Sequence, residues 1–455
     1  MPRTPRRNNS SHALASRPTL SQPLSANSIV SRRFYSSTAI DGGEQRSTVS
    51  IPIDGKAVNF SAVLLRDSCS CPSCVHESTN QRLFSVADIP ANVKARTVHV
   101  DTAANSVSIN WDNDAHGFAP EHTTQLDMAT LRAFSQSASS PTSCLPSQVM
   151  WGQDPRKSLD LPDYNYDTYM KDDETLYKLI NQLRIDGLAF VTNVPGVEES
   201  LATIATRIGP IKDTFYGYTW NVPQAINAAY TSHDLGFHTD LLYFQQPPHV
   251  QLLHCVQSAS SGGASVFADA YRAAVDLFKT DMDAFDTLAT VPVNYHYNHP
   301  DANVYRTTKP VIDLRPMRIG NKIYTRVQDY LKDSNDEPEA ALVDCMDKIN
   351  WGPPFLAPFS NHEDQGVSAL NDKVERWHDA AVKFNALLQR PEYLFERKMN
   401  PGDCVLFDNT RTLHSRRAFD IADVGKPRWL RGTYVDKDPY LSKLRVLQNK
   451  FGREE

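Results

Sequence analysis

Four His-x-Asp triplets give the chain its clearest capacity for metal chemistry. They begin at His99, His238, His299 and His362. Two histidines and one carboxylate on one face of a metal ion typically bind ferrous iron, and they leave its opposite face open for O₂ and a co-substrate. The chain therefore holds candidates for a non-haem iron oxygenase site, and their surroundings must separate them.

The triplet at His238 and Asp240 is the one followed by a strong strand pattern, the apolar run 250–256. The other three lie in polar turns or in a smaller N-terminal module. A partner histidine, His414, follows the buried-strand pattern 402–409. Since a catalytic metal needs ligands on rigid elements, we expect His238, Asp240 and His414 to bind iron.

A positive charge is expected beside the iron, at Arg428 on the strand-like run after the last ligand. A planar guanidinium that faces into a barrel needs a carboxylate partner. We expect that partner to be the far carboxylate of 2-oxoglutarate, whose keto-acid end would chelate the iron. Arg431 competes for this role, and Arg416 and Arg417 are expected to be surface charges.

A second metal cluster is predicted at Cys69, Cys71 and Cys74, which lie too close together for separate disulfides. Zinc requires four ligands, so one more must come from elsewhere. The nearby candidates are His76, His99, His116 and His122. We favour His116, because it follows the strand ending at Trp111 and can return from a neighbouring hairpin. A closed Cys₃His shell leaves no position for substrate, so this zinc is expected to be structural.

The first 40 residues differ in composition from the rest: they contain six arginines, nine serines and no acidic residue. This composition is typical of a mitochondrial transit peptide, so we expect 1–40 to be a disordered matrix-targeting segment; a disordered polar tail is the alternative. Its removal would change the formal charge from −6 to −12 (−6 − 6). An acidic body suits a small cationic ligand better than nucleic acid. No apolar stretch reaches the ~18 residues of a membrane span.

The remaining chain divides into a small β-rich zinc module at 47–133, a Ser- and Pro-rich linker at 134–166, and a larger domain at 167–448. In the module, strands are predicted at 50–53, 58–65, 95–100 and 106–111. In the larger domain, helices are predicted at 173–185, 197–208, 270–279 and 371–388. Its strands are predicted at 187–194, 250–256, 264–269, 291–297, 322–325, 403–407 and 429–435. Many short strands with few flanking helices favour a mainly β domain, a double-stranded β-helix or jelly roll.

Several motifs together carry a family resemblance. The run Arg66-Asp67-Ser68-Cys69-Ser70-Cys71-Pro72-Ser73-Cys74 matches Arg-Asp-x-Cys-x-Cys-x-x-Cys, and Phe237-His238-Thr239-Asp240, Val250-Gln251-Leu252-Leu253-His254-Cys255 and Leu413-His414 are also similar. With them, the chain beyond its N-terminal segment resembles the gamma-butyrobetaine dioxygenase and trimethyllysine dioxygenase family of TauD-type 2-oxoglutarate oxygenases.

The resemblance implies an aromatic cage for a trimethylammonium group, formed here by Tyr216, Trp220, Tyr230 and Tyr434, with Asn227 contacting the substrate carboxylate. Aromatic faces attract a quaternary ammonium, which cannot donate a hydrogen bond. Where butyrobetaine enzymes have a second asparagine, this chain reads Ile349-Asn350-Trp351-Gly352. That departure leaves the choice among betaines open.

We therefore expect an Fe(II)- and 2-oxoglutarate-dependent dioxygenase, with ascorbate as reductant, that hydroxylates a small trimethylammonium acid. Conversion of gamma-butyrobetaine to L-carnitine, in carnitine biosynthesis, is the first choice. Trimethyllysine is the second, favoured by the N-terminal segment and by Tyr243-Phe244-Gln245; a TauD-like oxygenase of another small substrate is a further alternative. The rival from another class is a zinc-stapled binding protein without chemistry, which would bind no iron. A homodimer is left open.

Overall fold

The computed structural model describes residues 47–135, 145–152, 159–221, 235–259, 261–360, 366–418 and 428–452. The predicted targeting segment 1–40 and the site candidates Asn227 and Tyr230 lie outside these residues. The chain divides into two compact units, Met1–Pro141 and Thr142–Glu455. Within the described residues, no helix has the length and apolarity needed to cross a membrane.

The first unit is a small β-rich module with its own hydrophobic core. Strands β1 (Thr48–Ile53) and β2 (Lys56–Ser61) form a hairpin, and β3 (Lys94–Asp101), β4 (Ser106–Asn113) and β5 (Thr123–Asp127) form an antiparallel sheet. Two short helices, α1 (Ala62–Asp67) and α2 (Met128–Ser135), complete the unit. Alternate residues of β4, Val107, Ile109 and Trp111, are buried, as expected of a sheet with one solvated face.

The prediction of one strand over 58–65 is wrong in its second half. The strand β2 ends at Ser61, and the apolar residues that follow belong to α1. A short apolar run does not distinguish a buried strand from one turn of helix by periodicity. This helix leads directly into the cysteine loop, since Ser68 is its C-cap.

The second unit is built on two sheets, and it has the mainly β architecture that the sequence predicts. The six-stranded sheet has the order β6-β7-β19-β10-β21-β8, and the four-stranded sheet the order β18-β11-β20-β9. The six strands are β6 (Asp163–Asn165), β7 (Leu188–Thr192), β8 (Trp220–Asn221), β10 (Val250–Gln257), β19 (Cys404–Asp408) and β21 (Trp429–Val435). The four are β9 (Leu235–His238), β11 (Ser265–Asp269), β18 (Leu394–Arg397) and β20 (Thr412–Arg416).

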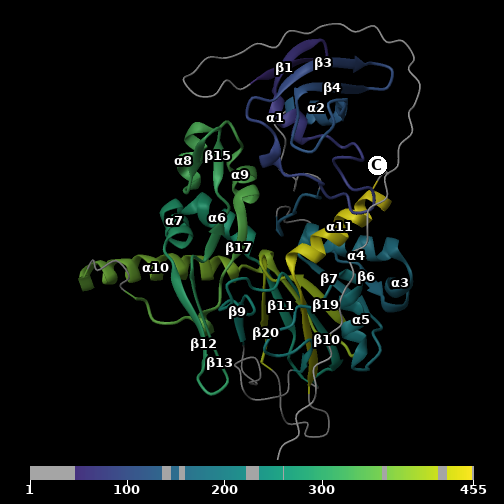
Figure 1. The fold of residues 1–455 in the computed structure, drawn as a ribbon. Helices are drawn as coiled ribbons and strands as arrows, with labels where there is room; N and C mark the ends of the chain where they lie inside the picture. The colour runs from purple at the N-terminus through teal and green to yellow at the C-terminus, as the bar shows by residue number, and fades with distance from the viewer. Residues whose placement is uncertain are drawn as a thin grey trace, which may run out of the picture. The chain divides into compact units, whose positions relative to one another are not determined.

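Helices cover the outer face of the six-stranded sheet, where α4 (Asp173–Asp186), α5 (Glu199–Ile208) and α11 (Lys437–Phe451) lie beside β7, β19 and β10 (Figure 1). The helix α4 follows from its sequence: the Asp172 carboxylate accepts hydrogen bonds from the N–H groups of Glu174 and Thr175, and Gly187 ends the helix in the left-handed region at φ 73°. Its Leu176, Leu179, Ile180 and Leu183 form the buried stripe.

A second group of helices packs against the four-stranded sheet. Helices α6 (Ala270–Thr280), α7 (Met282–Thr290) and α10 (Gly366–Leu388) share one large apolar core with residues of that sheet. The other elements are α3 (Tyr166–Lys171), α8 (Val327–Asp333), α9 (Pro338–Cys345), β12 (Val293–His299), β13 (Asn303–Lys309), β14 (Ile312–Leu314), β15 (Met317–Ile319), β16 (Lys322–Tyr324) and β17 (Met346–Ile349). A separate apolar cluster that includes Phe190, Leu253, Phe267 and Val405 lies between the two sheets.

Candidate metal centres and active-site cavity

The three predicted iron ligands come together in the second unit. His238 ends β9 and His414 lies on the neighbouring strand β20, where the two residues are direct cross-strand partners. Their ring centroids are 4.1 Å apart. One ligand atom from each of His238, Asp240 and His414 lies within 4.8 Å of the others. The structure therefore brings the three predicted ligands together in one cluster.

A hydrogen bond sets the orientation of one histidine ligand and the tautomer of its neutral ring. The Nδ1 atom of His238 lies 2.9 Å from the carbonyl oxygen of Gly236, which can only accept, so Nδ1 carries the proton. The Nε2 atom is then left with a lone pair, and it lies 3.8 Å from Asp240 Oδ1. Burial lowers the pKa of His414 well below its ordinary value, and the adjacent His238 acts in the same direction. Burial thus favours the neutral form of His414, which is the form that binds metal.

The backbone around Asp240 is held by a second set of contacts. The side-chain oxygen of Asn409 accepts a hydrogen bond from the Asp240 N–H at 2.8 Å, and its Nδ2 donates to the Asp240 carbonyl at 3.1 Å. The next residue, Leu241, is buried with φ at 52°, a left-handed conformation that an apolar side chain seldom adopts. The turn after the carboxylate is therefore strained and fixed.

The two histidines and one carboxylate suit ferrous iron by donor type, and three buried or half-buried ligands leave the rest of a coordination sphere for exogenous groups. They lie in the wall of a cavity with an empty volume of about 630 Å³, including its opening to solvent. We call it the active-site cavity. Its wall also contains Tyr216, Trp220, Tyr434, Arg416 and Arg428.

Arg428 lies in this wall, as predicted. Burial lowers its pKa to about 10, and the nearby charge of Arg416 acts in the same direction. The competing candidate Arg431 does not line the cavity; its Nη2 donates to Thr219 Oγ1 at 2.9 Å, and its Nη1 donates to the Glu198 carbonyl. Two guanidinium groups, not one, therefore face the cavity.

The expectation that Arg416 is a surface charge is wrong, because this side chain is buried and lines the cavity. It lies two residues after His414 on β20, and side chains two apart on a strand share one face. That alternation was the signal in the sequence that could have placed Arg416. Arg417, on the opposite face, is exposed and pairs with Glu396, as expected.

Three of the predicted cage residues line the cavity as one aromatic wall. The centroid of Trp220 is 6.1 Å from that of Tyr216 and 5.8 Å from that of Tyr434. Trp220 lies over Gly432 of β21, where a Cβ atom would come within 2.2 Å of the indole. Only a glycine allows this close approach. The indole is therefore seated against the strand that also bears Tyr434.

Asn350, in the run that departs from the butyrobetaine pattern, is fully buried and does not line the cavity. Its side-chain Nδ2 donates to the Pro310 carbonyl at 2.9 Å, and its backbone carbonyl accepts from the Tyr295 hydroxyl at 2.6 Å. Asn350 thus holds the packing around β17 and is not available to a ligand in the cavity.

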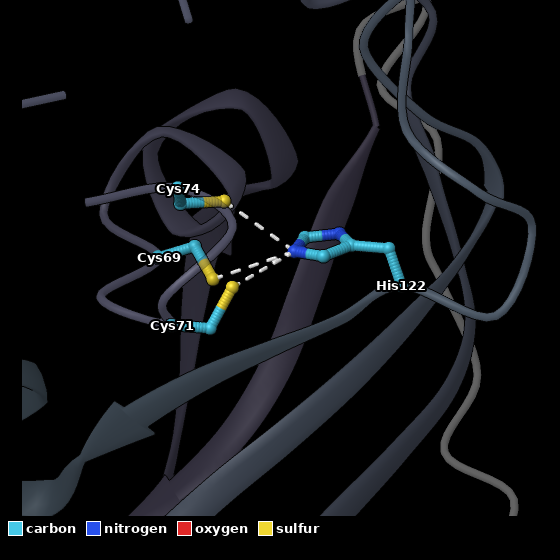
Figure 2. A group of neighbouring side chains, drawn as sticks. All are labelled: Cys69, Cys71, Cys74 and His122. Carbon is cyan, nitrogen blue, oxygen red and sulfur yellow. Dashed lines mark hydrogen bonds between the residues drawn. The ribbon is translucent and has the colours of Figure 1, made fainter. Parts of the chain in front are cut away.

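The zinc cluster of the first unit is closed. Figure 2 shows the thiols of Cys69, Cys71 and Cys74 converging on His122, whose Nε2 lies 3.7, 3.3 and 3.4 Å from the three sulfur atoms. A tetrahedral zinc ion, with bonds of about 2.3 Å to sulfur and 2.0 Å to nitrogen, would separate S and N by about 3.5 Å. The four side chains therefore fit a structural zinc ion.

The choice of His116 as the fourth ligand is wrong. His116 is exposed in the turn after β4, whereas the side chain of His122 is 7% exposed. The reason is β5, a strand absent from the predicted elements: it pairs with β4 and brings the residue just before it, His122, to the cysteine loop. Cys69 Sγ also lies 3.9 Å from the carbonyl of Thr123, at the start of that strand.

A carboxylate and a guanidinium stand behind the zinc ligands. Asp114 Oδ2 lies 2.6 Å from His122 Nδ1, so the carboxylate fixes the proton on Nδ1 and turns Nε2 toward the thiols. Asp114 Oδ1 accepts from Arg66 Nε, and Arg66 Nη1 lies 3.4 Å from Cys74 Sγ. Phe84 and Phe118 cover the guanidinium, with centroids 4.6 and 4.4 Å from its central carbon. Arg66 thus offers positive charge to a thiolate cluster.

The thiols differ in their electrostatics. Burial and the charge of Cys69 raise the pKa of Cys74, while Arg66 opposes this shift. For Cys71, burial also acts to raise the pKa, but hydrogen bonds from Cys69 and from the N–H groups of Ser73 and Cys74 outweigh it, so its pKa is lowered. Of the other cysteines in the described residues, Cys255, Cys345 and Cys404 are separate buried thiols, as predicted.

Comparison with curated relatives places these centres in a known context. The chain is similar to the "Dioxygenase str8" of Strobilurus tenacellus, at 34% identity over 427 residues, 89% of this chain and 90% of the relative. It is similar to the gamma-butyrobetaine dioxygenase of Pseudomonas sp. (strain AK-1), at 30% over 401 residues, 87% and 92% of the two chains. The mitochondrial trimethyllysine dioxygenase of Mus musculus is 26% identical over 398 residues, 86% and 84%.

Two family models match the chain. The model for the gamma-butyrobetaine hydroxylase-like N-terminal region matches residues 43–117, which include the three zinc cysteines. The model for the taurine catabolism dioxygenase TauD, TfdA family matches residues 145–434, which include the iron ligands and Arg428. The chain therefore belongs to the TauD/TfdA family and is an Fe(II)- and 2-oxoglutarate-dependent dioxygenase.

Proposed function

We propose that this dioxygenase hydroxylates a small trimethylammonium acid, with the conversion of gamma-butyrobetaine to L-carnitine as the first choice. The observation that carries the proposal is the aromatic wall of Tyr216, Trp220 and Tyr434 in the same cavity as the iron ligands. A quaternary ammonium has no N–H to donate, so aromatic faces are its natural partners. Relatives named gamma-butyrobetaine dioxygenase and trimethyllysine dioxygenase support this substrate class.

Each end of the cavity has a role in this proposal. Iron bound by His238, Asp240 and His414 would supply O₂ activation coupled to the oxidative decarboxylation of 2-oxoglutarate to succinate. Arg428 would hold the far carboxylate of 2-oxoglutarate, with the positive charge of Arg416 beside it. The aromatic wall would hold the substrate cation and exclude water from it.

Trimethyllysine is the second candidate, and the position of Asn350 favours it. The chain has no counterpart of the second butyrobetaine asparagine at this residue, because Asn350 is tied to Pro310 and does not line the cavity. The substrate carboxylate would then need a different contact. A third candidate is another small substrate, because the relative that is 34% identical to this chain is named only as a dioxygenase.

A direct assay separates these candidates. The purified protein is supplied with Fe(II), 2-oxoglutarate and ascorbate as reductant, and each amine is tested for the gain of one oxygen atom by mass and for equal formation of succinate. Gamma-butyrobetaine is expected to give both. Product from trimethyllysine alone would transfer the proposal to the second candidate, and product from neither would reject it.

The cation contact has its own control. We expect Trp220→Leu to raise KM for the accepted amine about 10-fold or more, in keeping with the ~2 kcal/mol of a desolvated cation–π contact. The isostere 5,5-dimethylhexanoate, in which an uncharged carbon replaces the quaternary nitrogen, should bind the native enzyme more weakly than gamma-butyrobetaine and be less affected by the substitution. Equal binding of the two acids would contradict a cation site.

The cellular setting is also a proposal. The arginine- and serine-rich composition of 1–40 supports import into the mitochondrial matrix. Fusion of these residues to a fluorescent protein is expected to direct it to mitochondria, and diffuse fluorescence would contradict the proposal.

The oligomeric state is a separate question. Light scattering of the purified chain, which measures its mass in solution, distinguishes a monomer from a homodimer.

A further inference from the structure

The carboxylate ligand Asp240 differs from the two histidine ligands in that it does not lie on a strand. His238 and His414 both lie on strands that pair with one another, whereas Asp240 lies beyond the end of β9. An aspartate can bind a metal through one oxygen or through both, and the second mode occupies an additional coordination position. Something other than the sheet must therefore set the mode of binding.

Two side chains donate to the same oxygen of this carboxylate. Gln251 Nε2 lies 2.7 Å from Asp240 Oδ2, and the Tyr434 hydroxyl lies 2.7 Å from the same atom. Because Oδ2 of an ionised aspartate only accepts, the Gln251 amide must present its N–H₂ group here. The other oxygen, Oδ1, is the one that faces His238 Nε2, at 3.8 Å.

The two donors are themselves a structural pair. Gln251 on β10 and Tyr434 on β21 are direct partners in the antiparallel register of the six-stranded sheet. Both side chains are buried, each 1% exposed. Residues directly opposite each other project from the same face of a sheet, so the two donors reach Asp240 together, from the sheet opposite the one that bears the histidines.

We propose that Gln251 and Tyr434 are positioning residues that occupy Oδ2 of Asp240 and restrict this carboxylate to binding iron through Oδ1 alone. Two donors use both lone-pair directions of Oδ2. With iron bound, the coordination position that a second carboxylate oxygen would take would then stay open for the co-substrate and O₂. The inference rests on the dioxygenase activity and is independent of which substrate the enzyme accepts.

In this inference Tyr434 has two roles, one in the aromatic wall and one at the iron ligand. Its ring forms part of the aromatic wall, with its centroid 5.8 Å from that of Trp220, while its hydroxyl holds the iron ligand. A ligand that displaces this ring would also disturb Asp240. Contact with the substrate and geometry at the iron are thus joined in one side chain, which a simple cage residue would not provide.

The experiment measures iron before any substrate is added. Tyr434→Phe removes the hydroxyl and keeps the ring; Gln251→Met removes the donor and keeps the volume. Matched controls are Tyr440→Phe, whose hydroxyl donates to the Ile180 carbonyl on the outer face of the sheet, and Gln257→Met, at the other end of β10. Fe(II) affinity, the charge-transfer absorption of the Fe(II)–2-oxoglutarate complex and the melting temperature are recorded for each.

Both site variants are expected to bind Fe(II) about 10-fold more weakly, within the 10- to 100-fold range typical of outer-shell contacts, and to shift the absorption band, while the controls change neither. With an accepted amine, both should consume more 2-oxoglutarate per hydroxylated product than the native enzyme. Native iron affinity and an unchanged band in both site variants would overturn the proposal. A melting temperature lowered equally in site and control variants, without those changes, would assign the contacts to stability alone and would also overturn it.

Failure of this proposal is distinguishable from failure of the proposed function. Trp220→Leu alters the aromatic wall without touching Asp240, so it is expected to leave Fe(II) affinity and the absorption band unchanged even where it weakens amine binding. Loss of iron in that variant as well would show that the wall as a whole, and not the two hydrogen bonds, sets the geometry.

Discussion

The two metal clusters of this protein differ in what surrounds their ligands. In the first unit, four ligands converge from a loop and a strand end, and the residues behind them, Asp114 and Arg66, supply charge and direction. In the second unit, three ligands leave one side facing a cavity walled by aromatic and basic residues. A closed shell stabilises the chain around it, whereas an incomplete one keeps reactivity available.

The supporting contacts differ in the same way. The carboxylate Asp114 orients the zinc histidine and is not itself a ligand, whereas the carboxylate Asp240 is a ligand and is oriented by an amide and a hydroxyl. One cluster is held by charge and the other by neutral donors. Neutral donors keep the iron centre from gaining a further fixed charge beside a site that must accept an anionic co-substrate.

The largest expected effect separates the two clusters by stability. Removal of zinc, by a chelator or by His122→Ala, should unfold much of 47–135, because structural zinc contributes ~10–16 kcal/mol in small domains. Hydrogen exchange measured by mass spectrometry should show the loss of protection in that range. Removal of iron should leave protection in both units nearly unchanged. Equal effects of the two metals would break the comparison.

The next largest effect is expected at the iron cluster, where a substitution should lower activity and leave stability nearly unchanged. Asp240→Asn keeps the shape of the side chain and removes its charge, so product formation should fall by at least ~100-fold, beyond the usual effect of an outer-shell residue. The free energy of unfolding should change by less than about 1 kcal/mol, as measured by denaturant titration, and bound zinc should stay at one ion per chain. A large loss of stability would mean that the iron cluster also holds the fold.

A smaller effect is expected at the outer shell of the zinc cluster. Asp114→Asn weakens the acceptor that fixes His122, so zinc affinity should fall about 10- to 100-fold in a competition titration with a chromophoric chelator. Turnover with saturating zinc should be unchanged. The matched control is Asp112→Asn, which removes an exposed carboxylate on β4 that pairs with Arg96 of β3 and should leave zinc affinity as it is.

The smallest expected effect tests the identity of the fourth zinc ligand. His116→Ala should leave zinc content, melting temperature and activity within experimental error, because the side chain is exposed in a turn. His122→Ala, by contrast, should release zinc. Release of zinc from the His116 variant would contradict the assignment that the structure supports.

The site residues that could be predicted from the sequence are those that lie next to an apolar run typical of a buried strand. His238 and His414 were found because apolar runs stand beside them, and Arg428 because it precedes one. His122 was missed because β5, with the sequence TTQLD, has only one strongly apolar residue and gives a weak strand signal. Its partner Asp114 also could not be found, since a single aspartate in a turn has no distinguishing pattern.

A second group of residues could be predicted from the sequence only by working out which face of its strand each side chain occupies. Arg416 follows from its two-residue spacing to His414 on β20. Gln251 is a polar residue inside the apolar run of β10, which indicates a buried functional contact, but its target Asp240 is defined only by the pairing of β10 with β21. Cross-strand register between distant segments is a tertiary property, so the local pattern of apolar and polar residues does not predict it.

The pairing of His238 with His414 across β9 and β20 also bears on how the protein matures. All four zinc ligands lie before residue 123 and can meet while the rest of the chain is still being synthesised. The iron ligands cannot meet until β20, near the end of the chain, has been added beside β9. Since contacts between distant segments form late, zinc would be acquired by the nascent chain and iron only by the finished one.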